Sequence, residues 1–223
     1  MKILNTIHED YHMHCINYSD GMNTIDEIVQ YADKIGLKKI VITDHSQIVL
    51  DKANISLKSP RSMIQNRRKN VHNDLDVSFG IEGDLINENG DFCFDIKGLE
   101  SDFNILSCHA SIFQGDLKNV TQAYTNAIIK YHDKIKFIGH ICQSQTSKYL
   151  DIDAIAKVLN QYKVSIELNC FYLNEGGTDL DKLNKLLSLL ETGVYVNSDM
   201  HTLNDFGFRQ AGFDYLKSLG YSN

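Results

Sequence analysis

Histidines and carboxylates follow short apolar runs along the whole chain, and side chains of these types bind metal ions. Six of the nine histidines occupy such positions. With three carboxylates they form a set of nine candidate ligands: His12, His14, Asp20, His45, Glu82, His109, His140, Asp199 and His201. Imidazole nitrogens and carboxylate oxygens are ligands for zinc and related divalent ions. Random placement would scatter the histidines, so the joint pattern predicts one metal site to which many strands contribute.

Two of the candidate pairs are spaced two residues apart. On a strand, alternate residues face the same side, so His12 and His14 can bind one ion together. Asp199 and His201 repeat this spacing near the other end of the chain. Asp20 follows the first pair and adds an oxygen ligand. Alone, an Asp-x-His sequence is more often a structural turn, so these pairs gain meaning from the full set.

Glu82 ends an apolar strand, where an ionised carboxylate is unfavourable unless it is paired or bound to metal. The other candidates are less specific when each is taken alone. Asp44 and His45 can equally form a satisfied polar pair, and a lone His109 or His140 at a strand end is more often a core histidine. Their combination favours the metal site.

The elements that position these residues alternate between strand and helix. Apolar runs predict buried strands over 40–42, 77–81, 103–106, 136–138 and 164–166. Helical periodicity predicts helices over 25–35, 152–159 and 183–190, the first opened by a capping box of Thr24 and Glu27 and closed by Gly36. Such alternation is typical of a parallel sheet. Seven strands suffice to close an α/β barrel with its site at the C-terminal strand ends.

A flat, doubly wound sheet is the competing architecture, but it would gather functional groups chiefly at one switch point. The segment 86–92 contains Asn89-Gly90 and predicts a small hairpin beside the site. We expect a single domain over residues 1–223.

Composition narrows the classes of protein. The chain is 43% hydrophobic and 23% charged, which excludes a disordered or a membrane protein. Its net charge of -7 makes non-specific binding to duplex nucleic acid an unfavourable role. Five cysteines without framework spacing, and a poor signal sequence at the N-terminus, predict a cytoplasmic location.

Together these motifs resemble the polymerase and histidinol phosphatase (PHP) superfamily of metal-dependent phosphoesterases, over nearly the whole chain. His12-x-His14 with Asp20 resembles its first motif, and Thr43-Asp44-His45 its second. Gly80-Ile81-Glu82 resembles its Gly-x-Glu motif, and the later single histidines His109 and His140 match as well. Ser198-Asp199-Met200-His201 resembles the closing motif. The small YcdX-like, histidinol-phosphatase-like branch is the most similar.

The resemblance implies a distorted (β/α)7 TIM-like barrel with two or three divalent ions, which the family binds as zinc, manganese or iron. The implied ligands are His12, His14, Glu82 and Asp199 for the first ion, Glu82, His109 and His140 for the second, and Asp20, His45 and His201 for the third. Cys15 and Ile141 depart from the family pattern, where Thr or Ser and Pro are common. They touch no ligand but can reshape the substrate rim.

The implied activity is hydrolysis of a small phosphate monoester by a metal-bound hydroxide, as in histidinol phosphatases, with Glu82, Asp199 and His201 as catalytic residues. A nuclease or phosphodiesterase acting on single strands or nucleotides is the alternative, and a metal-binding interaction module is a third class. Bound phosphate would need a cationic clamp from Arg67, Arg68 or Arg209, although Arg67 and Arg68 are more typical of a solvated helix face. Asp44 and Glu167 are expected to orient the ligands.

Two further groups of residues are expected outside the site. Cysteines near strand ends are expected to be small core residues: Cys15, Cys108, Cys142 and Cys170. The remaining histidines, His8, His72 and His132, are expected to face solvent. The sequence offers no physical reason to choose one phosphate ester, one metal or one oligomeric state.

Overall fold

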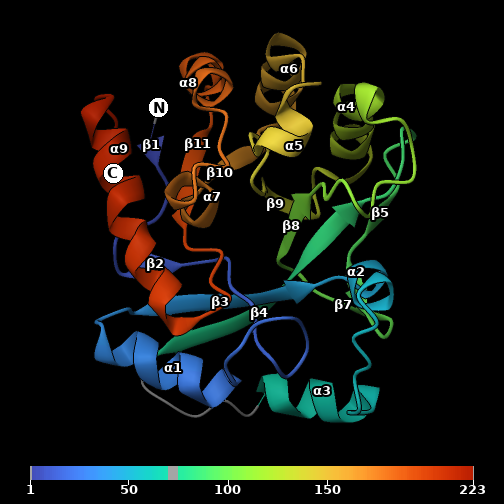
Figure 1. Cartoon of the computed structure of the whole chain (residues 1–223), viewed down its shortest axis with the longest axis vertical. Coiled ribbons are helices and arrows are strands. Elements are labelled where there is room, and N and C mark those ends of the chain that lie inside the picture. Colours follow the sequence, from blue (N-terminus) through green and yellow to red (C-terminus); the bar gives the residue numbers. More distant parts are fainter. Residues whose placement is uncertain (1, 70–74, 223) are drawn as a thin grey trace.

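The computed structural model describes residues 2–69 and 75–222, whose strands form one curled sheet with helices on its outer side (Figure 1). Eight strands follow one another in the order β1-β11-β10-β9-β8-β4-β3-β2, and every neighbouring pair is parallel. They span Lys2–Ile3 (β1), Glu9–Asp10 (β2), Lys39–His45 (β3), Asp76–Leu85 (β4), Asn104–Ser107 (β8), Ile135–Ile138 (β9), Ser165–Asn169 (β10) and Gly193–Asn197 (β11). The predicted TIM-like α/β fold is confirmed as a curled half-barrel.

The first strand of the barrel is divided into two short pieces. β1 pairs with β11 at one end of the sheet, whereas β2 pairs with β3 at the other end. The chain continues past β2 so that Met13 forms a parallel bridge with Met200 and accepts a hydrogen bond from Thr43 N at 2.9 Å. The same stretch of chain therefore links both ends of the sheet and carries His12 and His14 between them.

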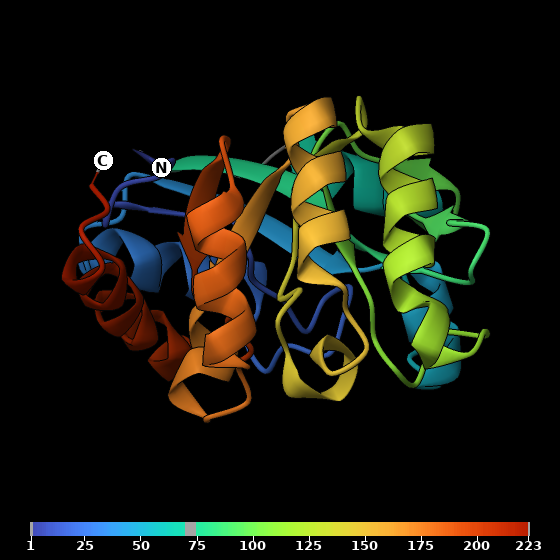
Figure 2. The same ribbon diagram turned by 90° about the horizontal axis from the view of Figure 1, so that it is seen from above.

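Helices follow most of the strands, as the alternating pattern predicts. They span Ile25–Lys34 (α1), Gln47–Lys52 (α2), Arg61–Lys69 (α3), Val120–Tyr131 (α4), Ser144–Ser147 (α5), Ile152–Tyr162 (α6), Cys170–Asn174 (α7), Leu180–Leu189 (α8) and Arg209–Ser218 (α9). The predicted capping box of Thr24 and Glu27 starts α1, and Gly36, with φ of 83°, follows its end. α4, α6 and α8 lie side by side over the outside of the sheet (Figure 2). None of the described helices combines the length and apolar character needed to cross a membrane.

The connection from β4 to β8 departs from the alternation, because it contains short strands where a helix would be expected. These are Phe92–Cys93 (β5), Asp95–Ile96 (β6) and Leu99–Glu100 (β7). The predicted hairpin is confirmed, since β5 pairs antiparallel with β4 and Gly90 N donates to Asn87 O at 3.0 Å in the turn. The hairpin packs on α4, where Asn126 Nδ2 donates to Glu88 O at 2.8 Å.

Inside the curled sheet, an apolar layer lies one level below the candidate ligands. Tyr11, Val41, Ile105 and Phe137 form this buried cluster. Each precedes a candidate ligand on its own strand or segment, so the layer fills the N-terminal half of the barrel interior. The candidate ligands lie beyond this layer, toward the C-terminal half of the strands, where the barrel opens.

Candidate metal centre

The structure brings all nine candidate ligands to the C-terminal ends of the strands. Eight of them form three overlapping groups in which the ligand atoms lie within 4.8 Å of one another. The groups are His12, His14 and Asp199; His45, Glu82 and His109; and His14, Asp20, His45 and His201. His140, the ninth, contacts Glu82. The overlap through His14 and His45 differs in detail from the division among three ions that the resemblance implies, but the same residues take part.

Glu82 lies at the centre of these groups and is 1% exposed. Its Oε2 lies 3.5 Å from His12 Nε2, 3.5 Å from His14 Nε2 and 2.9 Å from His45 Nδ1. Its Oε1 lies 2.7 Å from His140 Nε2. Each carboxylate oxygen therefore faces different imidazoles, an arrangement that suits a carboxylate shared by two ions.

Asp199 and Asp20 supply the other carboxylates. Asp199 Oδ1 lies 3.1 Å from His14 Nε2 and 3.4 Å from His12 Nε2. Asp20 Oδ1 lies 3.6 Å from His201 Nε2. Asp199 has a φ of 54°, in the left-handed region that non-glycine residues seldom adopt. Such backbone strain is typical of residues held in place for function.

Several of the buried polar atoms have no hydrogen-bond partner among the residues that the structure describes. They include His12 Nε2, His45 Nδ1 and Glu82 Oε2, which all point to the same place. A buried polar atom left unsatisfied costs about 1–3 kcal/mol, so a protein seldom gathers several of them. Divalent cations would satisfy these atoms together, and both the donor types and their convergence fit such ions.

Neighbouring charges oppose the effect of burial at Glu82 and add to it at His14. Burial alone would raise the pKa of the Glu82 carboxyl, but His12, His45 and His109 hold it well below its usual range. Burial lowers the pKa of His14 to about 3, with the help of the nearby His45. An ionised carboxylate and a neutral imidazole are the protonation states that bind metal.

Glu167 contacts two of the candidate histidines, the ring of His12 and the backbone of His140. Its Oε1 lies 2.9 Å from His12 Nδ1, and its Oε2 accepts a hydrogen bond from the backbone N–H of His140 at 3.1 Å. Asn169 Nδ2 donates to Glu167 Oε2 at 3.1 Å and Asn197 Nδ2 donates to Glu167 Oε1 at 2.9 Å. Glu167 therefore contacts the ring of His12 and the backbone of His140, a position from which a carboxylate can orient metal ligands.

Asp84 was not identified as a site residue from the sequence, although its spacing from Glu82 indicates one. Its Oδ1 lies 2.6 Å from His109 Nδ1, and its Oδ2 accepts a hydrogen bond from Ser46 Oγ at 2.9 Å. Asp84 is two residues after Glu82 on β4, so both side chains face the same side of the strand. The Glu-x-Asp spacing repeats the alternation of His12 and His14 and would have identified it.

Asp44 contacts a different group from the one expected. Its carboxylate accepts hydrogen bonds from Cys15 N at 2.7 Å and from Cys15 Sγ at 3.0 Å. Burial raises the pKa of Asp44 to about 6, against the lowering effect of these hydrogen bonds. It therefore anchors the backbone just after His14 rather than the side chain of a candidate ligand.

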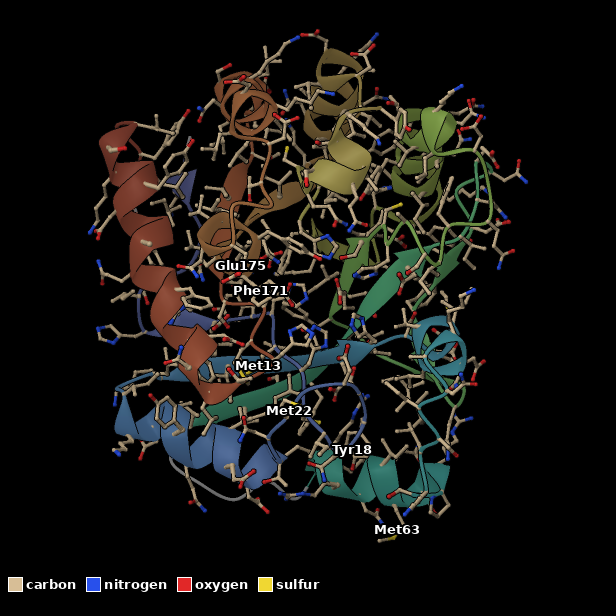
Figure 3. The ribbon with its side chains drawn as sticks, in the orientation of Figure 1. Met13, Tyr18, Met22, Met63, Phe171 and Glu175 are labelled. Carbon is tan, nitrogen blue, oxygen red and sulfur yellow. The ribbon has the colours of Figure 1, made fainter. Side chains whose placement is uncertain are left out.

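The ligands border a cavity of about 270 Å³ that opens at the C-terminal end of the barrel. Its lining residues are Asp20, His45, Glu82, His109, Phe171, Tyr172, Asp199 and His201. Sequence reasoning missed Phe171 and Tyr172, which lie on the short α7 directly after β10. Phe171 lies between the ribbon of α7 and strand β3 in the view of Figure 3. No residue of the hairpin at 86–92 is among those that line this cavity.

None of the three candidate arginines lines this cavity, which corrects the predicted phosphate clamp. The Arg209 guanidinium is buried and donates to the carbonyls of Ile7 at 2.8 Å and Glu9 at 2.5 Å. Arg67 pairs with the exposed carboxylate of Asp26. Arg68 lies over the ring of Phe79, 5.6 Å from its centroid. All three guanidiniums face other parts of the fold.

The residues expected outside the site are found there. The four cysteines named above are buried, and His8 and His132 are exposed. His72 lies outside the residues that the structure describes.

Comparison with known proteins agrees with this geometry. The PHP domain family model matches residues 10–173. A probable phosphatase of Caldicellulosiruptor bescii is 29% identical over 203 residues, which cover 88% of this chain and 80% of that protein. The DNA polymerase/3′-5′ exonuclease PolX of Bacillus subtilis is 29% identical over 217 residues, which cover 90% of this chain but only 35% of that protein.

Among solved structures, the histidinol phosphate phosphatase of Lactococcus lactis, in complex with zinc, L-histidinol and phosphate, has the same fold. The TM-score is 0.60 at 15% sequence identity, and the match covers 96% of this chain and 94% of that one. Because the family model spans well over half of the sequence, the chain belongs to the PHP domain family.

Proposed function

We propose that this protein is a metal-dependent phosphatase that hydrolyses a small phosphate monoester. The observation that carries the proposal is the convergence of nine candidate ligands on one centre, six of which line a cavity of about 270 Å³. A cavity of this volume accommodates a small metabolite. The probable phosphatases among the relatives and the histidinol phosphate phosphatase fold agree with this activity.

Charge balance supports three divalent ions at the site. The ligand set contains only three carboxylates, Asp20, Glu82 and Asp199, and the other six ligands are imidazoles. Three divalent ions would bring six positive charges against three negative ones. The ligands alone would leave an excess of three positive charges. The buried carboxylates of Asp84 and Glu167, which contact His109 and His12, would reduce it to one, so the site would still be positive toward a phosphate dianion. A cationic clamp then becomes unnecessary, in keeping with a cavity whose described lining contains no arginine or lysine.

The ligands have distinct parts in this proposal. Glu82 would be shared between two ions, Asp199 would act with His12 and His14, and His201 would act with Asp20 at the cavity mouth. Bound divalent ions lower the pKa of water and neutralise charge that develops on the phosphoryl oxygens. The chain itself holds the imidazoles in fixed orientations, so little reorganisation is needed during the reaction.

A nuclease is the second candidate, because the Bacillus subtilis relative is a DNA polymerase/3′-5′ exonuclease and matches 90% of this chain. A groove that tracks a single strand combines basic residues with aromatic ones. The net charge of -7 and the absence of lysine and arginine from the described cavity lining favour the monoesterase.

The direct test compares two chromogenic esters at equal metal loading. Purified protein is reloaded with zinc or manganese, and release of nitrophenol is measured from p-nitrophenyl phosphate and from bis-p-nitrophenyl phosphate. We expect faster cleavage of the monoester. Faster cleavage of the diester, or efficient digestion of single-stranded DNA, would identify a nuclease. A panel that includes histidinol phosphate would then search for the natural substrate.

A further inference from the structure

Two aromatic side chains form one wall of the metal cavity, and their place in the fold is fixed through a candidate metal ligand. Asn169 ends β10 and caps α7, since its Oδ1 accepts a hydrogen bond from Tyr172 N at 3.1 Å. The Nδ2 of the same side chain donates to Asp199 Oδ2 at 2.9 Å. One asparagine therefore ties the backbone of Tyr172 to a carboxylate of the metal centre.

The two rings contact histidines that follow different strands. The ring of Tyr172 meets that of His140 edge-on, with centroids 5.3 Å apart. Phe171 lies edge-on to Tyr172 at 5.7 Å and also contacts His201, at a centroid distance of 6.0 Å. The wall therefore runs from one candidate ligand to another, directly beside the place where a substrate would bind.

Tyr172 differs from the other polar residues that line the cavity because its hydroxyl group can donate a hydrogen bond. Carboxylates that bind metal can only accept hydrogen bonds. The imidazoles would use one nitrogen for metal, while their other nitrogen faces protein oxygen, as His109 Nδ1 faces Asp84 Oδ1 at 2.6 Å and His201 Nδ1 faces Asp199 O at 3.0 Å. The backbone N–H of Tyr172 donates to Asn169, whereas its hydroxyl makes no hydrogen bond to another residue that the structure describes. A phenol remains protonated near neutral pH, so it is a permanent donor.

We propose that Tyr172 is a catalytic residue whose hydroxyl donates a hydrogen bond to the leaving-group oxygen of the substrate. This inference rests on the proposed phosphatase activity. As water adds to phosphorus and the ester P–O bond breaks, the electron pair of that bond moves to the leaving oxygen. The Tyr172 hydroxyl stabilises this developing negative charge. The water that adds to phosphorus loses one proton to solvent and the released alkoxide or phenoxide takes one proton from solvent, so the products are hydrogen phosphate and the alcohol or phenol. No redox partner or covalent enzyme intermediate is required.

The test uses the full chain with Tyr172→Phe, which removes the hydroxyl and keeps the ring. Two monoesters are compared, phenyl phosphate with a poor leaving group and p-nitrophenyl phosphate with a good one. We expect kcat/KM for phenyl phosphate to fall by roughly 100-fold, the usual effect of losing one donor to a developing oxyanion. The loss for p-nitrophenyl phosphate should be much smaller, because nitrophenolate delocalises its own charge.

Controls separate this assignment from a structural effect and from failure of the proposed function. Tyr162→Phe removes a hydroxyl from α6, where the ring packs on His132 away from the cavity, and should leave both rates unchanged. Metal content and melting temperature of Tyr172→Phe should match those of the parent protein. An equal loss with both esters, or no loss, would overturn the leaving-group assignment. Lack of activity in the parent protein would instead overturn the phosphatase proposal.

Discussion

Glu82 contacts more of the candidate ligands than the other carboxylates do, because its two oxygens face imidazoles from several strands. Glu82→Gln keeps the volume of the side chain and removes its charge. We expect the rate of phosphate release to fall by at least roughly 100-fold, since an electrostatic contact to the reacting centre is lost. Circular dichroism and the melting temperature check that the fold survives.

His132→Ala is the matched control for Glu82→Gln, because His132 is an exposed histidine remote from the cavity. It should leave the rate unchanged. Near-native activity of Glu82→Gln would require another bridging carboxylate, and Glu167, which lies 2.9 Å from His12 Nδ1, would be tested next.

Asp84 contacts the candidate ligand His109, so we expect its substitution to change metal affinity more than it changes the fold. Asp84→Asn keeps the size and one hydrogen-bonding oxygen but removes the charge that faces His109 Nδ1 at 2.6 Å. Loss of such an orienting carboxylate typically weakens metal binding by about 10–100-fold. Competition with a chelating dye measures this directly. An unchanged dissociation constant would show that His109 is held by other contacts.

At this scale the sequence predicts which side chains lie near the cavity and leaves open how they are oriented. The candidate ligands could be gathered from the sequence because strand ends converge in a barrel whatever the details of packing. The direction in which the arginine side chains point could not be predicted from the sequence. A position beside a strand does not determine where a long side chain points. Arg209 follows the last strand closely, yet its guanidinium turns to the carbonyls of Ile7 and Glu9.

The elements show a similar division between local and long-range causes. α1 was predicted with its capping box and terminating glycine, because those signals act within one turn of helix. The split first strand was not predicted. Asn5 takes the place of a backbone pairing there, since its side chain accepts from Val196 N at 2.8 Å and donates to Val196 O at 2.9 Å. A contact between residues 191 positions apart leaves no local pattern.

The hairpin after β4 gives a test of element packing that is independent of the metal centre. Gly90 has a φ of 77°, and a Cβ at this position would overlap the Ala127 backbone nitrogen of α4. Gly90→Ala should therefore lower the free energy of unfolding by roughly 1–3 kcal/mol. Urea denaturation measures the change. Metal affinity should be preserved, because the hairpin does not line the cavity.

Gly36→Ala is the control for that substitution. Gly36 has a φ of 83°, but no described atom lies within 4 Å of the place that an added Cβ would occupy. Gly36→Ala should show only the cost of holding a non-glycine residue in the left-handed conformation, roughly 1–2 kcal/mol. Equal losses for the two variants would mean that the hairpin moves away from α4 at little cost.

For the whole molecule, the metal centre joins segments that are far apart in the sequence. The candidate ligands extend from His12 to His201 and come from β3, β4 and the segments that follow β2, β8, β9 and β11. An ion bound to groups from several strands stabilises the folded chain, because the unfolded chain does not hold those groups together. Stability should therefore depend on metal concentration. At a free metal concentration about 100 times the dissociation constant, one site contributes about 2.7 kcal/mol.

Removal of metal should lower the melting temperature, and reloading should restore it. Protein purified without chelator should contain two to three divalent ions per chain by elemental analysis, because nine ligands exceed what one ion can coordinate. The Tyr162→Phe variant should show the same stoichiometry, whereas Glu82→Gln should lose at least one ion. A stoichiometry below one that persists after reloading with zinc and manganese would contradict the metal assignment. In that case the buried carboxylates would have to be balanced by protonated His12 and His45 instead of by metal. The surrounding carboxylates raise the pKa values of both histidines, against the lowering effect of burial.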